Sequence, residues 1–221
     1  MNKINWLDHL TNLLVVILGI SIAFYLEGYR ESEASKNRER QYLESLTADL
    51  EADLEALDTL RQINELISKA VVSLSNASVD QRYEDQSTLR NDVLIIQYNP
   101  PFTPQRTIYE SMKSAGQMNQ ITDFELRKSI TELYEQYYRG TDQYDDALSE
   151  HVRDFIKPFC MEQVKFTSAN SVDDAFLNHH VFRNMIFAYR YLFIAKDNFY
   201  KEVMKKAEEV KLKIENHLNE L

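Results

Sequence analysis

Residues 43–74 read LESLTADLEADLEALDTLRQINELISKAVVSL. Ten positions in this stretch recur at alternating steps of three and four; apolar side chains fill eight of them, and Asp53 and Asn64 fill the other two. This spacing is typical of a helix that buries one stripe, the N-terminal seam, against other helices. Because no glycine or proline interrupts residues 31–78, the sequence predicts one long amphipathic helix.

Upstream of that helix lies an uncharged apolar segment, Leu10 to Leu26, which reads LTNLLVVILGISIAFYL. Its 17 residues form about 26 Å of helix, close to the ~30 Å of a hydrocarbon core. Trp6, Tyr25 and Tyr29 flank the segment, as aromatic side chains do at membrane interfaces. We therefore expect a transmembrane helix whose partner is the lipid bilayer.

This anchor, residues 1–30, is expected to stay attached to the following domain, residues 31–221. A cleaved signal peptide would use Ser21-Ile22-Ala23 as its small-residue site, but Lys3 with Asp8 makes a weak basic start. A buried core helix would need apolar neighbours on every side. A helix that lies flat on a membrane would need a strongly charged face, which the segment lacks.

One face of the apolar segment carries small or polar side chains. Asn12, Val16, Gly19 and Ala23 follow one another at steps of four, three and four, so they share a side of the helix. The pair Gly19 and Ala23 lets two membrane helices approach closely, and Asn12 can hydrogen-bond across such a contact. We expect these four residues to pack transmembrane helices, although glycine and alanine are also common in single spans.

Basic residues around the segment give an orientation. Only Lys3 precedes it, whereas four basic residues follow it closely: Arg30, Lys36, Arg38 and Arg40. Since basic loops are retained on the cytoplasmic side, this count places the C-terminal domain in the cytoplasm.

The middle of the chain is expected to be helical as well. Residues 88–98 predict a helix, with a lone strand as the alternative, and residues 105–114 predict a short helix. Between them, Asn99–Pro104 holds three prolines and must be an extended turn. Thr122 and Glu125 have the spacing of a capping box and predict the start of a helix that reaches Pro158.

The end of the chain predicts a second long seam. Residues 166–170 read as a loop, and Ser171 with Asp174 indicates another helix start. The last helix carries apolar residues at helical spacing, with Lys196 and His217 as interruptions. This C-terminal seam comprises Phe182, Ile186, Tyr189, Phe193, Tyr200, Val203, Ala207, Val210, Ile214 and Leu221. Two long seams predict an all-α protein: an elongated antiparallel bundle of about four helices behind a transmembrane helix.

Composition narrows the classes of function. The chain has 221 residues, four glycines and four prolines, which favours long helices over a sandwich or barrel. Its net charge of −10 argues against a nucleic-acid partner, because phosphate binding needs a basic face. The single cysteine, Cys160, is expected to be buried.

No motif of catalysis or ligand chemistry is present in the sequence. There is no H-E-x-x-H, no C-x-x-C, no glycine-rich phosphate loop and no G-x-S-x-G. His179 and His180 are neighbours, and adjacent helix positions face different ways. We therefore expect no enzyme activity, no catalytic residues, no cofactor and no metal.

Two sets of side chains are candidate surfaces for a ligand or partner. The first is an acidic run without lysine or arginine between residues 41 and 60: Glu44, Asp49, Glu51, Asp53, Glu55 and Asp58. The second is a tyrosine cluster: Tyr134, Tyr137, Tyr138 and Tyr144. The plain alternatives are a solvated helix face for the acids and core packing for the tyrosines.

Several stretches carry a resemblance. They are residues 13–31, beginning LLVVILGI, then FTP at 102–104, YESMKSAG at 109–116 and residues 121–134. They resemble a family of bacterial single-span membrane proteins known only as a domain of unknown function. The resemblance implies an anchor in the inner membrane, a helical domain in the periplasm and no catalytic residues. The N-terminus of this chain is shorter than in that family and lacks its basic cluster.

These observations support two hypotheses. The first is a non-enzymatic scaffold or interaction protein that forms a homo-oligomer or serves as an accessory subunit of a membrane complex. The second is a ligand-sensing bundle that holds a small molecule between its helices, near the tyrosines or the turn at Asn99–Pro104.

Overall fold

The computed structural model describes residues 6–80, 83, 85–169 and 171–221, with side chains at residue 10 and from residue 13 onward. The described chain is almost entirely helical, as predicted. Its α-helices are α1 (Trp6–Asp80), α2 (Gln86–Ile95), α3 (Thr107–Ser114), α4 (Phe124–Glu132), α5 (Arg139–His151), α6 (Lys157–Gln163) and α7 (His180–Glu220). Shorter elements are the 3-10 turns η1 (Gln117–Gln120) and η4 (Asp174–Asn178), and the π-helical segments η2 (Leu133–Tyr138) and η3 (Val152–Ile156).

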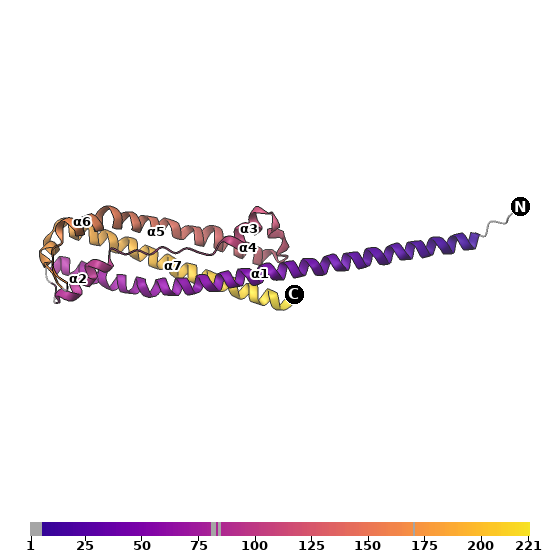
Figure 1. Cartoon of the computed structure of the whole chain (residues 1–221), viewed down its shortest axis with the longest axis horizontal. Helices are drawn as coiled ribbons and strands as arrows, with labels where there is room; N and C mark the ends of the chain where they lie inside the picture. Colours follow the sequence, from indigo (N-terminus) through magenta and orange to yellow (C-terminus); the bar gives the residue numbers. More distant parts are fainter. Residues whose placement is uncertain (1–5, 81–82, 84, 170) are drawn as a thin grey trace.

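Helix α1 dominates the shape of the molecule. Its 75 residues form one uninterrupted helix of about 110 Å. The N-terminal part projects away from the rest of the chain, and only the later part packs into a bundle (Figure 1). Glu39 is the first buried residue along the described part of α1.

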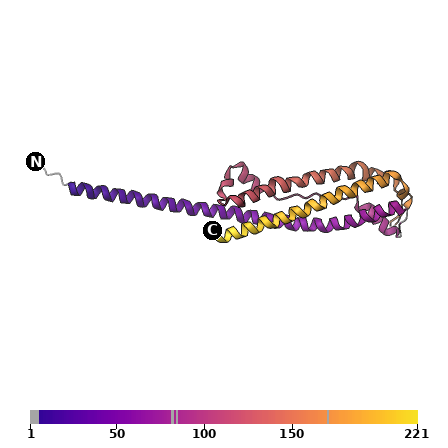
Figure 2. The same cartoon turned by 180° about the vertical axis from the view of Figure 1, so that it is seen from behind.

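Three long rods make up the bundle. The second half of α1 lies antiparallel to α7, and the C-terminus ends beside α1 near the point where the bundle begins (Figures 1 and 2). The third rod runs from α4 through η2, α5 and η3 to α6, and it packs on α7. The short helices α2 and α3 pack against α1.

The predicted seams form the core. All ten positions of the N-terminal seam are buried, Asp53 and Asn64 included. The C-terminal seam is buried from Phe182 to Ile214, and Lys196, expected to interrupt it, is itself fully buried. The buried side chains divide into a proximal core near the start of the bundle, which contains Leu43–Leu60, and a distal core near its tip, which contains Ile67–Ala77.

The long third rod passes Pro158 without ending. The π-helical segment η3 widens the turns just before it, and Pro158 lies at the start of α6, directly after these wider turns. The region around residues 88–98 forms helix α2, so the strand alternative there is wrong.

Two predicted helix starts are wrong. Helix α4 is capped by Asp123, whose carboxylate accepts the Leu126 N–H, rather than by Thr122, because the Thr122 hydroxyl is engaged by Glu39. Ser171 starts no helix and lies in a two-stranded hairpin, β1 (Phe166–Ser168) with β2 (Ser171–Val172), in place of the expected loop. Asp173 caps η4 instead.

Candidate functional site

The extended segment between α2 and α3 lies along the bundle, and most of its residues are exposed or half-buried. Phe102 is buried within it, and prolines reduce the number of backbone N–H groups that need partners there. The Phe102 N–H donates to Asp145 Oδ2 at 3.1 Å and to the Tyr200 hydroxyl at 3.0 Å. Further along, the Gln105 N–H donates to Asp53 Oδ1 at 2.8 Å. Two buried carboxylates on different helices therefore hold this segment.

One of these carboxylates belongs to a buried ion pair. Lys196 on α7 is 0% exposed, and its ammonium lies 2.9 Å from Asp145 Oδ1 on α5. It also donates to Asn99 Oδ1 at 2.7 Å and to the Pro100 carbonyl at 3.1 Å. These three acceptors satisfy all three donors of the ammonium. Burial lowers the pKa of Lys196, and the adjacent carboxylate of Asp145 opposes that shift.

Tyr200 completes the polar group around the ion pair. Its hydroxyl lies 2.8 Å and 2.7 Å from the two carboxylate oxygens of Asp145 and donates to that carboxylate. The Asn99 amide donates to Ser149 Oγ at 2.9 Å. Because α5, α7 and the extended segment are tied together by charge-assisted hydrogen bonds, the group positions the segment.

The second carboxylate, that of Asp53, has only one of its two oxygens hydrogen-bonded. Asp53 is 1% exposed, and beyond the Gln105 N–H its other oxygen, Oδ2, lacks a hydrogen-bond partner. The buried hydroxyls of Tyr134 and Tyr138 and one oxygen of Asp49 also lack partners. Burial is the main cause that raises the pKa of Asp53 to about 6, and it also raises the pKa of Asp49. Part of the acidic run and part of the tyrosine cluster thus meet at one polar site.

The remaining two tyrosines lie elsewhere. Tyr144 and Tyr137 stack on Phe199 of α7, with ring centroids 4.7 Å and 6.3 Å apart. Gly140 lies directly under the same ring, and a Cβ there would come within 2.6 Å of its Cζ atom. These side chains pack η2 and α5 against α7, which agrees with the core-packing interpretation for this half of the cluster.

The acidic run does not form one surface. Glu44, Glu51 and Glu55 are exposed, Asp49 and Asp58 are half-buried, and Asp53 points into the core. Two of these acids are paired: Glu51 lies 3.0 Å from Lys211, and Asp58 lies 2.8 Å from Arg61. A helix turns by about 100° per residue, so consecutive acids are distributed around α1.

The proposed packing face of the apolar segment is open. Val16 and Ala23 are exposed, and nothing lies within 4 Å of a Cβ placed on Gly19. The side chain of Asn12 lies outside the described residues. Nothing in the described chain covers these three positions.

A third buried carboxylate closes the bundle at its proximal end. Glu39 Oε1 accepts the Thr122 N–H at 2.7 Å and lies 3.0 Å from His217 Nε2. It therefore joins α1 to the loop before α4 and to the end of α7.

Sequence reasoning missed most of these polar contacts. Glu39 resembles the exposed acids that surround it in the chain, and nothing near Asp145 distinguishes it from neighbouring acids. Lys196 did carry a signal, because a lysine at a core-facing position implies a buried partner. The sequence does not indicate which acid serves as that partner.

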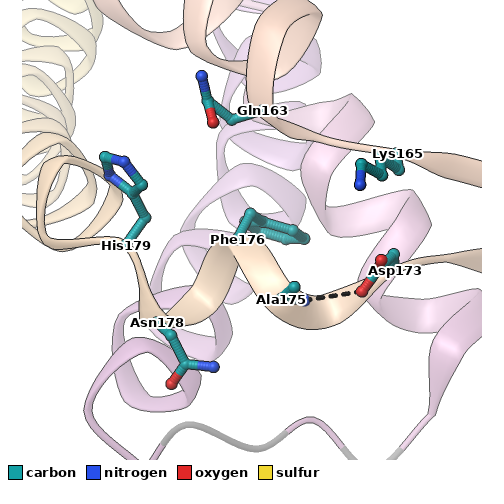
Figure 3. A pocket seen from close by; sticks show the side chains of 7 residues that line it. All are labelled: Gln163, Lys165, Asp173, Ala175, Phe176, Asn178 and His179. Atoms are coloured by element: carbon teal, nitrogen blue, oxygen red, sulfur yellow. Dashed lines mark hydrogen bonds between the residues drawn. The ribbon is translucent and has the colours of Figure 1, made fainter.

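A shallow hollow of about 350 Å³ lies at the distal tip. Gln163 and Lys165 line it from the end of the third rod, and residues between Asp173 and His179 line its other side (Figure 3). Within the described residues, no group of three or more His, Cys, Asp and Glu side chains is placed to hold a metal ion. Cys160 is buried as expected, and burial raises its pKa to about 12.

Comparison with known proteins places the chain in a family. No curated protein and no solved structure matches it. A family model described as a family of unknown function (DUF6090) matches residues 12–214, from the apolar segment almost to the end of α7. Since that match covers most of the sequence, the chain belongs to the DUF6090 family of unknown function.

Proposed function

We propose that this chain is a membrane-anchored helical scaffold or interaction protein without enzyme activity. The observation that carries the proposal is the exposed apolar part of α1. A window of 18 residues in this helix has a mean hydropathy of 1.6, and none of it is buried against the rest of the chain. The same helix continues into the bundle, so an anchor and a packed domain are rigidly joined.

The free energy of transfer from water to a membrane favours lipid around the apolar part of α1. Residues 13–26 contain ten leucine, isoleucine, valine and phenylalanine residues. At about −0.3 to −0.6 kcal/mol each, these side chains contribute about −3 to −6 kcal/mol to membrane insertion. In water the same side chains would form an apolar surface of a kind that monomeric proteins rarely expose.

A charged neck separates the anchor from the bundle. From Leu26 to Glu39 the helix advances about 20 Å and carries both acidic and basic side chains. These residues make few contacts with the bundle, since most of them are exposed. Such a spacer would hold the bundle clear of the lipid headgroups and present its sides to partners.

Self-association is the mode of interaction that we propose first, and an accessory role in a membrane complex is the second. The open face of Val16, Gly19 and Ala23 supports close packing of two membrane helices. Copies anchored in one bilayer would stand parallel, so identical positions would lie at the same depth.

The experiment is to purify the full chain in mild detergent and to measure its mass by light scattering. We expect a dimer or a larger assembly, or a complex with another membrane protein. Replacing Gly19 and Ala23 by isoleucine should dissociate a self-associated form. A matched control on another side of the helix, Leu14→Ile with Leu18→Ile, should not. A wild-type chain that is monomeric and has no partner would contradict the proposal.

We place the anchor in the inner membrane of a bacterium and the bundle in the periplasm, as the family resemblance implies. The basic residues that follow the anchor favour the cytoplasm instead. Protease added to cells with a permeabilised outer membrane should digest the bundle while a cytoplasmic marker stays intact. A bundle that resists the protease would indicate that it lies in the cytoplasm instead.

A ligand-sensing bundle is the second candidate function. Two features favour it: the hollow at the distal tip and the unpartnered oxygens between α1 and η2. A thermal-shift screen of small polar metabolites on the full chain tests this function, and the absence of any stabilising compound would count against it.

A further inference from the structure

We propose that Asp53 is a proton-binding group inside the proximal core, and that its protonation removes a buried negative charge while it keeps the contact between α1 and the segment that leads into α3. The inference concerns the packed bundle and does not depend on what surrounds the apolar part of α1.

The geometry around Asp53 is incomplete for a charged carboxylate. The side chain is almost fully buried, one oxygen accepts the Gln105 N–H, and the other oxygen has no hydrogen-bond partner. An ionised carboxylate in the interior is normally paired with a cation or fully hydrogen-bonded. The ion pair of Lys196 with Asp145 in the same bundle shows what a complete arrangement looks like.

Charged and titratable groups face Asp53 from each element around it. Asp49, one turn earlier on α1, adds a second negative charge. Arg106 is the nearby cation, but it donates to the Tyr138 carbonyl at 2.8 Å and lies 3.9 Å from Asp142, so no direct ion pair with Asp53 forms. From η2 come the hydroxyls of Tyr134 and Tyr138.

A third tyrosine joins this group from α3. Tyr109 stacks on Tyr134 with ring centroids 4.3 Å apart, and its own hydroxyl donates to Glu135 at 3.0 Å. It therefore supports the ring of Tyr134, whose hydroxyl, like that of Tyr138, has no hydrogen-bond partner within the described residues.

Protonation of Asp53 would remove a buried negative charge that has neither a cation nor a full set of hydrogen bonds. A proton from solvent binds the unpartnered oxygen of Asp53, and the side chain changes from charge −1 to neutral. The new O–H group can donate to a tyrosine hydroxyl oxygen, while the other oxygen keeps the Gln105 N–H. The buried charge is removed and the link from α1 to the segment before α3 remains.

The sign of the pH effect follows from burial. The pKa of Asp53 is raised from its usual 3.8 to about 6 in the folded chain. A group whose folded pKa is raised contributes stability that is fully present below the unfolded pKa and is lost as pH rises through the folded pKa. The stability that Asp53 contributes to the folded bundle should therefore be fully present below pH 4. It should be lost as the pH rises from about 4 through about 6.

The test is thermal unfolding of the full chain in detergent between pH 4 and pH 8, for the wild type, Asp53→Asn and Glu55→Gln. Asparagine keeps the acceptor for Gln105 and removes the charge. We expect Asp53→Asn to melt about 5 °C above the wild type at pH 8, with the difference vanishing towards pH 4 and half of it reached at about pH 5, between the unfolded and folded pKa values of Asp53. Glu55→Gln, on the exposed side of α1, should show no pH-dependent difference. A difference that is negative at pH 8 or independent of pH would overturn the inference.

A second measurement covers the case in which the Asp53→Asn variant fails to fold. The carboxyl carbon of Asp53 in ¹³C-labelled wild-type chain should titrate near pH 6, and a midpoint near pH 4 would overturn the inference.

Discussion

The two parts of α1 belong to one helix and yet bury their side chains in different ways. Leu18, in the apolar part, is 59% exposed, whereas Leu57, in the bundle, is 0% exposed. In the apolar part nearly every position is hydrophobic, and in the bundle hydrophobic residues are confined to one stripe with charges around it. A stripe is matched to protein neighbours on one side, whereas an all-round apolar surface is matched to a medium that is apolar on every side.

The two parts differ in the period of their apolar residues rather than in the amount of them. Both parts are rich in leucine, and no break in the helix marks the transition. The transition is marked by Glu39, where the first buried contact begins. Substitutions on the two sides of Glu39 should consequently have very different effects on the stability of the bundle.

The largest effect is expected where the packed part of the molecule buries a charge. Lys196→Ala leaves the Asp145 carboxylate buried without its cation, so unfolding of the bundle should become easier by about 3–5 kcal/mol. Chemical denaturation measures the change. Lys201→Ala, on the exposed side of α7, should cost about 0–1 kcal/mol, and an equal loss in both variants would contradict the role of the buried pair.

The next prediction compares alanine substitutions in the two parts of α1. Leu57→Ala removes a fully buried side chain and should lower the free energy of unfolding by about 2–4 kcal/mol. Leu18→Ala and the exposed Leu66→Ala should each change it by less than about 0.5 kcal/mol. A similar loss for Leu18→Ala would show that the apolar part packs on the bundle and is not free to enter lipid.

A smaller effect is expected at the contact of α5 with α7. Alanine is the better helix former, yet the Cβ of Gly140→Ala would overlap the Phe199 ring. We expect a net destabilisation of about 1–2 kcal/mol, measured as a lower melting temperature. Combining it with Phe199→Leu should make the alanine neutral or stabilising, and a loss that persists in that background would exclude the ring contact as the cause.

The seams were the most predictable feature, because helical spacing depends only on local sequence. Every position of the N-terminal seam that the spacing selects is buried, including the polar Asp53 and Asn64. The starts of short elements were less predictable. Thr122 has the right spacing for a cap, but Glu39 engages its hydroxyl from another helix, and a local pattern contains no such information.

The polar site was predictable only in part. The acidic run and the tyrosine cluster were each recognised from the sequence, yet only Asp49, Asp53, Tyr134 and Tyr138 come together. The π-helical turn of η2 determines which tyrosines face α1, and this change of register is not visible in the spacing of the residues. The pairing of Lys196 with Asp145 joins residues 51 positions apart in sequence and needs the tertiary fold.

Membrane anchoring through the apolar part of α1 is the central claim, and flotation tests it most directly. Cells that express the full chain are lysed, the membranes are washed with alkaline carbonate, and the pellet is floated in a density gradient. We expect the chain at its full length in the floating bilayer fraction, together with known integral membrane proteins. Release into the carbonate supernatant, or a mature chain that begins after Ala23, would contradict the claim.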